Sequence, residues 1–144
     1  LASRARRRVR AASAGPDGVT QRHDELVRAF LEASRAGNFS ALLALLNPGA
    51  TLRADAAVVA MGGAAYWQND RLQAGIEGAD AVARTFSRRA RAAQPVFIDG
   101  KPGAVWMHEG EVRVAFRFRI VDDRITAIEL IADRAAIAQS VIER

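Results

Sequence analysis

The alternation of apolar residues with arginines in EVRVAFRFRI, residues 111–120, limits the fold of this chain more than any other feature. Five apolar side chains fall on one face of this segment: Val112, Val114, Phe116, Phe118 and Ile120. Three arginines fall on the opposite face: Arg113, Arg117 and Arg119. A period of two residues is typical of a β-strand with one buried face. The chain therefore has to build a sheet and cover its apolar side with other elements.

The segments around this strand predict three further strands. PVFID (95–99) and AVWMH (104–108) are separated by the turn residues GKPG (100–103), and Glu109-Gly110 turns the chain into 111–120. Asp122-Asp123 then supplies a turn into ITAIELIA (125–132). Consecutive strands joined by short turns predict a four-strand antiparallel meander over 95–132.

Helices are predicted mainly before the meander, where apolar residues recur at helical spacing. We expect one at 20–36, beginning at Thr20, one at 39–46, capped by Asn38, and one at 79–93, after Gly78. A short strand is expected at 50–54 and a terminal helix at 133–143, whereas residues 55–77 show no steady period. This order predicts an α+β fold in which three helices cover the apolar face of the sheet.

The net charge of the chain is concentrated in its first ten residues, LASRARRRVR. They hold five arginines and no acidic residue, and they account for the whole formal charge of +5. These arginines are Arg4, Arg6, Arg7, Arg8 and Arg10. Residues 1–10 are predicted to form a short basic helix, residues 11–19 a linker rich in small residues, and residues 20–144 the folded domain.

Several classes of protein are excluded by what the sequence lacks. It has no cysteine, so it forms neither a disulfide nor a thiolate metal site, and no histidines stand at ligand spacing. We therefore expect no metal and no cofactor. No apolar run approaches the length of a membrane span, and no hydrophobic segment follows the basic start as in a signal peptide. The expected location is the cytoplasm, without contact to a membrane.

Three strings in the chain resemble the nuclear transport factor 2-like fold, also called the SnoaL-like fold. They are AFLEASRAGNFSALLALLNPGATLRAD (29–55), GADAVARTFSRRAR (78–91) and FRIVDDRITAIELIAD (118–133). The resemblance covers about residues 20–132. It implies a cone in which three helices pack within a curved, mostly antiparallel sheet.

The string LASRARRRVR resembles the end of the last helix of region 4 in an extracytoplasmic-function sigma factor. Joined to a SnoaL-like domain, it is similar to the sigma-factor subfamily with such a C-terminal extension. The resemblance implies that the five arginines contact promoter phosphates, together with a helix-turn-helix upstream of this chain. It also implies that the domain contacts the sigma core domains and RNA polymerase, and so regulates transcription initiation.

Two sequence strings of that subfamily are only partly present here. Its Asp-Gly-Gly-Gly-basic string begins at Asp55 but continues as Ala56-Ala57-Val58, and only Asp133 matches its Asn-Pro-Asp-Lys-Leu-like string. The resemblance therefore places regulatory contacts at Asp55 and Asp133.

A free-standing enzyme is the alternative that the fold resemblance leaves open. SnoaL-like relatives include isomerases and cyclases that place an acid or base in the apolar cone. Candidate cavity residues here are Tyr66, Trp67, Trp106 and His108. They include no convincing pair of acid and base, so no catalytic residue is assigned. We therefore expect a regulator rather than an isomerase, hydrolase or cyclase acting on a small apolar substrate. The cone is expected to hold a small apolar ligand.

The arginine face of residues 111–120 suggests a third class of function, a dimerisation module. Arg113, Arg117 and Arg119 are candidates for a subunit interface or for a contact with the sigma core domains, because arginine is favoured at interfaces. A homodimer is therefore a further expectation.

Overall fold

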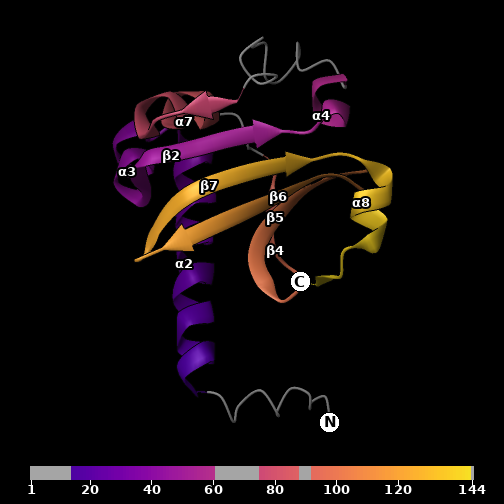
Figure 1. Cartoon of the computed structure of the whole chain (residues 1–144), viewed down its shortest axis with the longest axis horizontal. Helices are drawn as coiled ribbons and strands as arrows, with labels where there is room; N and C mark the ends of the chain where they lie inside the picture. The colour runs from indigo at the N-terminus through magenta and orange to yellow at the C-terminus, as the bar shows by residue number, and fades with distance from the viewer. Residues whose placement is uncertain (1–13, 61–74, 88–91, 144) are drawn as a thin grey trace.

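A curved sheet of seven strands forms the frame of the computed structural model, which describes residues 14–60, 75–87 and 92–143 (Figure 1). The strand order is β3-β2-β7-β6-β5-β4-β8, with β2 and β7 parallel and the other neighbours antiparallel. The strands are β2 (Leu46–Ala54), β3 (Ile76–Glu77), β4 (Gln94–Ile98), β5 (Lys101–His108), β6 (Glu111–Val121), β7 (Arg124–Ile131) and β8 (Ile142–Glu143). The predicted meander is confirmed as β4 to β7.

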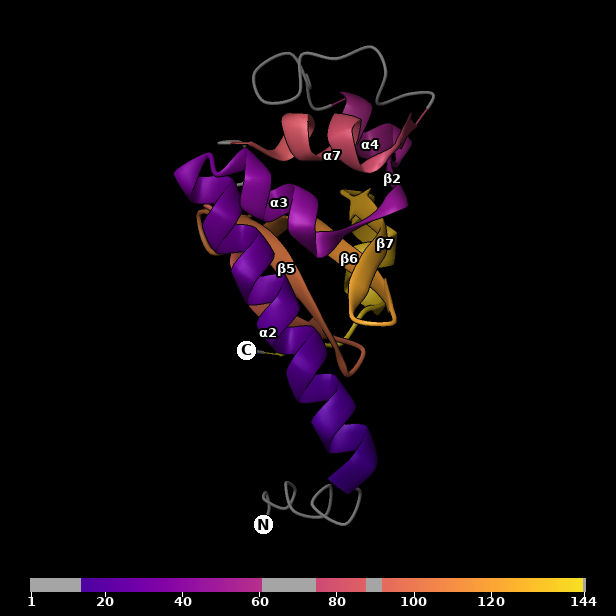
Figure 2. The ribbon, with the colours of Figure 1, turned by 90° about the vertical axis from the view of Figure 1, so that its left-hand side faces the viewer.

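Helices on one face of the sheet bury its apolar side. They are α2 (Ala14–Ala36), α3 (Phe39–Leu45) and α7 (Ala79–Phe86), and Figure 2 shows α2 crossing the sheet diagonally. Two short helices, α4 (Ala56–Ala60) and α8 (Arg134–Gln139), lie near the other end of the sheet (Figure 1). The structure is thus an α+β fold with the three expected covering helices. Within the described ranges no helix combines the length and apolar character needed to cross a bilayer.

Aromatic rings fix the helices against the sheet. The Phe30 ring of α2 meets the rings of Phe86 and Phe118 edge to face, with centroids 5.0 and 5.6 Å apart. The fully buried Ser34 hydroxyl also donates a hydrogen bond to the Phe86 carbonyl. The C-terminal half of α2 is therefore joined to both α7 and β6.

The first helix begins earlier than predicted. It starts at Ala14 rather than at Thr20, so residues 14–19, expected in the linker, are helical. Pro16 is compatible with this because the first N–H groups of a helix have no partner within the helix. The predicted basic helix at 1–10 lies outside the described residues.

Two other helices end earlier than predicted. The helix α7 ends at Phe86 rather than at residue 93. Residue 93 directly precedes β4, which begins at Gln94. The helix α8 ends at Gln139 rather than at residue 143. Its C-terminal continuation is extended instead, because Ile142 pairs with Ile98 in β4 and makes this segment strand β8.

The first hairpin of the meander turns at Asp99-Gly100, not over residues 100–103. Both turn residues have positive φ, 52° and 81°, as a two-residue hairpin with the twist of its strands requires. Lys101 pairs with Ile98, so Lys101 and Pro102 already belong to β5. The predicted turn was wrong because Asp-Gly supplies a shorter turn than the following Lys-Pro-Gly.

A β-bulge interrupts the alternation of residues 111–120. Val114 pairs with Trp106, whereas Val112 pairs with Met107, so Arg113 is an extra residue in β6. Val112 consequently packs in a second apolar cluster, on the opposite face from the main core. The prediction that Val112 shares the core face was wrong. The second cluster contains Val96, Ile98, Val105 and Ala115, with Ile137 and Ile142 packed against it.

Candidate functional site

An open groove of about 740 Å³ lies where β5 and β6 separate. The pairing of these strands ends with Gly103 opposite Arg117. β6 continues for four more residues, 118–121, which have no partner on β5 in the part of the chain that the structure describes. The groove is lined by these residues, by the start of β5, by α2 and by the outer face of β2 and β7.

The local sequence explains why the strands separate at this position. Lys101 and Ile98 flank the two-residue turn and form a hydrogen-bonded pair, so the backbone N–H and C=O of Lys101 point toward β4. The backbone nitrogen of the next residue, Pro102, therefore points toward β6. Proline has no N–H, so it cannot donate a further ladder bond. At Gly103 the strands are still tightly packed, because a Cβ there would lie 2.7 Å from the Phe116 carbonyl oxygen. The groove begins directly after this close contact.

The N-terminal half of α2 forms one wall of the groove. Val19, Thr20 and His23 line it, and Arg22 Nε lies 3.6 Å from Asp123 Oδ1 in the β6–β7 turn. This exposed ion pair connects the helix with the tip of the hairpin. The early start of α2 therefore matters for the site, because a helix beginning at Thr20 would leave Val19 outside it.

The groove is predominantly cationic. Four cationic side chains line it and one acidic side chain, Glu129, stands among them. The cationic residues are Arg53, Lys101, Arg117 and Arg119. In the strand register Glu129 lies between Arg53 on β2 and Arg117 on β6, so its charge is outnumbered locally. The arrangement favours a bound anion over a bound cation.

A carboxylate outside the groove already binds one of these cations. Arg117 Nη2 donates hydrogen bonds to Asp99 Oδ2, at 2.8 Å, and to Ser140 Oγ, at 3.1 Å. Asp99 Oδ1 accepts a second bond, from the Val141 N–H, at 2.8 Å. The bond from Val141 and the bond from Arg117 lower the pKa of Asp99 below its usual 3.8. Arg117 is thus held by Asp99 of the β4–β5 turn and by Ser140 of the C-terminal segment.

The other three cations are available to a ligand. Arg53, Lys101 and Arg119 are exposed, and within the described ranges none of them forms an ion pair. They stand on three different strands, β2, β5 and β6, and all line the groove.

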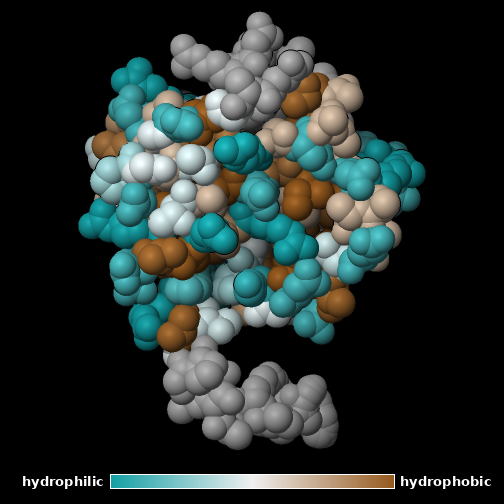
Figure 3. Space-filling view, viewed as in Figure 1, coloured by the Kyte–Doolittle hydropathy of each residue, from teal (hydrophilic) through white to brown (hydrophobic). Residues whose placement is uncertain are grey.

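Apolar side chains form the rest of the lining. Of the three large hydrophobic residues that the described structure leaves exposed, Val19 (40%) and Val121 (50%) both line the groove. Phe118, Ile120 and Pro102 add further apolar surface. Figure 3 shows brown apolar surface at the free end of the β6–β7 hairpin and beside α2, next to teal polar side chains. The site is therefore amphipathic.

The predicted regulatory residues Asp55 and Asp133 both have partners within the domain. Asp55 Oδ1 accepts a hydrogen bond from the Val58 N–H, at 2.9 Å, and so caps α4. Its Oδ2 accepts bonds from the N–H groups of Ala132 and Asp133, both at 3.0 Å. Asp133 in turn caps α8 through the Ala136 N–H, at 3.0 Å. The two carboxylates lie together where β2 and β7 end, and their regulatory role stays a prediction.

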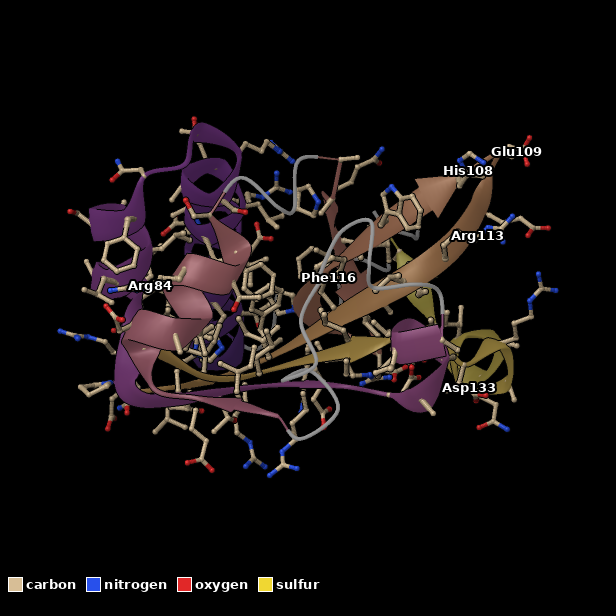
Figure 4. The ribbon with its side chains drawn as sticks, turned by 90° about the horizontal axis from the view of Figure 1, so that it is seen from above. Arg84, His108, Glu109, Arg113, Phe116 and Asp133 are labelled. Carbon is tan, nitrogen blue, oxygen red and sulfur yellow. The ribbon has the colours of Figure 1, made fainter. Side chains whose placement is uncertain are left out.

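The predicted cavity residues that the structure describes do not line this groove. The rings of Trp106 and His108 stack with centroids 6.2 Å apart, and His108 lies near the tip of the β5–β6 hairpin beside Glu109 (Figure 4). Trp106 packs against the main core, whereas the His108 side chain is 58% exposed. Tyr66 and Trp67 lie outside the described residues, as do Arg4, Arg6, Arg7, Arg8 and Arg10.

The three arginines proposed for an interface do not act as one group. Arg117 and Arg119 line the groove, but Arg113 lies in the bulge, and its Nε is buried with no hydrogen-bond partner in the described structure. An interface on this face remains a prediction for Arg113, Arg117 and Arg119.

Comparison with known proteins identifies the fold. No protein-family model and no curated protein matches the chain. Solved structures do match: an NTF2-like protein from Burkholderia xenovorans is 15% identical, with a TM-score of 0.50, over 83% of this chain and 95% of that one. The chain has an NTF2-like fold. Bal32a, from a soil-derived mobile gene cassette, has a TM-score of 0.51 at 15% identity, over 77% of this chain and 88% of that one.

A sigma factor shares this NTF2-like fold over part of its length. The extracytoplasmic-function sigma factor SigJ of Mycobacterium tuberculosis matches with a TM-score of 0.56 and 20% identity, over 78% of this chain. The match spans 42% of SigJ, so this NTF2-like chain corresponds to less than half the length of that protein. The predicted cone-shaped α+β fold is confirmed.

Sequence reasoning missed most residues of the groove. The sequence pattern predicts only strands around Arg53 and Glu129, and only a turn at Lys101 and Pro102. One available signal was Asp99-Gly100, since Asp-Gly between two strands is a strong indicator of a two-residue turn. That turn would have placed Pro102 inside a strand, where proline ends pairing on one side.

Proposed function

We propose that this NTF2-like chain is a regulatory domain of an extracytoplasmic-function sigma factor. It docks on the sigma core domains and changes how they engage RNA polymerase and promoter DNA. The five arginines at positions 4–10 contact DNA phosphates in the intact protein. The fold that the chain shares with part of SigJ supports this proposal, and so does the basic segment placed directly before the domain.

The observation that carries the proposal is the position of α2. This helix begins four residues after Arg10 and also supplies Val19, Thr20 and His23 to the groove. A ligand in the groove therefore touches the helix that follows the basic segment in the sequence. A ligand regulates through such a contact only if it binds two arrangements of the protein with different affinity. The helix α2 is continuous from Ala14 to Ala36, so a contact at residues 19–23 acts on the same helix that packs against α7 and β6.

The chemistry of the groove favours binding over catalysis. Its one carboxylate, Glu129, lies level with two arginines, and its one imidazole, His23, stands on a different element, α2. Proton-transfer enzymes bring an acid and a base to one reacting atom. We therefore propose a non-catalytic domain, in preference to an isomerase, hydrolase or cyclase.

Transcription in vitro tests this function. The complete gene product and a version ending at Arg10 would be compared with core RNA polymerase on the cognate promoter. Truncation is expected to change the transcript yield. Binding of the truncated factor to core polymerase, measured on native gels, shows that it is folded. Equal yields from two proteins that bind polymerase equally would contradict the regulatory role.

The basic segment needs a separate test. Replacing its five arginines by glutamine is expected to weaken promoter binding, whereas replacing them by lysine keeps the charge and most of the affinity, because phosphate contacts depend mainly on charge. Equal affinity of the glutamine variant and the wild type, measured by fluorescence anisotropy at fixed salt, would remove the assignment of these arginines.

A further inference from the structure

We infer that the groove between β5 and β6 binds a small amphipathic carboxylate, with an anionic head and an apolar tail. The inference rests on the geometry of the groove and does not depend on the role in transcription. It differs from the expected apolar ligand within the cone, because the groove opens where the sheet separates and includes residues of its outer face.

The volume and shape of the groove suit a small molecule. About 740 Å³ lies within the range of roughly 300–1,000 Å³ that is usual for small-molecule sites. A folded protein segment would need a larger and flatter contact. α2 closes the groove on one side and the β6–β7 hairpin on another, which limits the length of the occupant.

The cationic side chains select the head group. Arg53, Lys101 and Arg119 carry positive charges that no described ion pair compensates, and they come from three strands. Charge-assisted hydrogen bonds from guanidinium groups to a carboxylate are among the stronger polar contacts in proteins. Arg117 is already engaged by Asp99, so it fixes the floor of the groove rather than binding the head group.

The exposed apolar residues select the tail. Val19 and Val121 remain 40% and 50% exposed although both line the groove, and Phe118 and Ile120 extend the same surface. Covering exposed apolar area is favourable in proportion to that area. A short anion such as acetate would cover none of it, and a neutral alcohol would leave the cations without a counter-charge.

Calorimetric titration of the chain with sodium decanoate, below its micellar concentration, tests the inference. We expect binding of decanoate, and at least tenfold weaker binding of acetate and of decyltrimethylammonium, which lack the tail and the anionic head respectively. The double variant R53E/R119E is expected to lose affinity by roughly tenfold or more, because both head-group contacts become repulsive. R134E, on the exposed surface of α8 outside the groove, is the control for a charge reversal elsewhere on the surface and is expected to bind like the wild type.

Two further measurements keep the result interpretable. Circular dichroism shows that each variant is folded, and V121N removes apolar surface from the groove without adding a charge, so it is expected to weaken decanoate binding as well. Vesicles containing an acidic phospholipid present the same charge on a membrane, and we expect no co-sedimentation of the chain in which the five arginines at positions 4–10 are replaced by glutamine, a change that keeps the basic segment from binding the vesicles itself. The inference is overturned if decanoate fails to bind, if R53E/R119E binds it as tightly as R134E does, or if the vesicles bind in its place.

Discussion

Replacement of Asp55 by alanine is predicted to destabilise the fold by about 2 kcal/mol. The Asp55 carboxylate accepts three backbone hydrogen bonds, one from Val58 at 2.9 Å and two at 3.0 Å from Ala132 and Asp133. Loss of the helix cap costs about 1 kcal/mol. The half-buried Ala132 N–H loses a charged acceptor, which costs about 1 kcal/mol more, whereas water can replace the bond to the exposed Asp133 N–H.

The assay is thermal and urea unfolding followed by circular dichroism. A loss of about 2 kcal/mol lowers the Tm of a domain of this size by roughly 5–10 °C. Asp55→Asn keeps one acceptor oxygen, so it can accept either the bond from Val58 or the bonds from Ala132 and Asp133. We expect its free energy of unfolding to fall between those of the wild type and Asp55→Ala. Asp133→Ala removes only the cap of the short helix α8 and is expected to cost about 0.5–1 kcal/mol.

This comparison separates a structural from a regulatory role for Asp55. If Asp55→Ala unfolds within about 0.5 kcal/mol of the wild type, the range of an ordinary surface substitution, then the three hydrogen bonds do not hold β2 to β7 and the reasoning is refuted. A carboxylate used only for contact with another domain would give that result.

Three more predictions follow from the packing and hydrogen bonds. Gly103→Ala is expected to cost about 1–3 kcal/mol of unfolding free energy, because the new Cβ would lie 2.7 Å from the Phe116 carbonyl oxygen; an unchanged urea midpoint would contradict this. Ser34→Ala removes this buried hydrogen bond to the Phe86 carbonyl and is expected to cost about 1 kcal/mol, whereas a Tm equal to that of the wild type would argue against the bond. The pKa of Asp99 is lower in the folded state, so the ionised carboxylate stabilises the fold fully above the usual pKa of 3.8, and this stabilisation is lost as the pH falls through the lowered folded pKa. Hydrogen exchange of the β8 amides should accelerate in that pH range in the wild type but not in Asp99→Asn.

The meander was predictable because its signals are local. The alternation from Val114 to Ile120 and the turns at Glu109-Gly110 and Asp122-Asp123 lie within or between adjacent strands, and all appear in the structure. The cap of α3 by Asn38 is equally local, since its side chain accepts a bond from the Ala41 N–H.

Other features depend on partners far apart in the sequence. Nothing near Asp55 indicates that it accepts bonds from the backbone 77 and 78 residues later. The strand at Ile142 likewise forms only because β4 offers an open edge. The bulge at Arg113 cannot be read from a pattern that continues unbroken through Val112.

The groove was missed because it results from two such distant features together. Pro102 ends the pairing of β5 with β6, and an early start of α2 places Val19 against the opening. Neither feature alone would form a site. The charges are equally dispersed in sequence, since Arg53, Lys101 and Arg119 come from separate strands that only the sheet order brings together.

The claim that this opening is the ligand site is tested most directly by mapping decanoate on the chain with ¹⁵N–¹H correlation spectra. We predict that the largest amide shifts fall in residues 19–23 of α2, in Gly100 and Lys101 at the β4–β5 turn, and in residues 117–121 at the end of β6. Shifts centred instead on Trp106 and His108, or no saturable shifts at all, would contradict it.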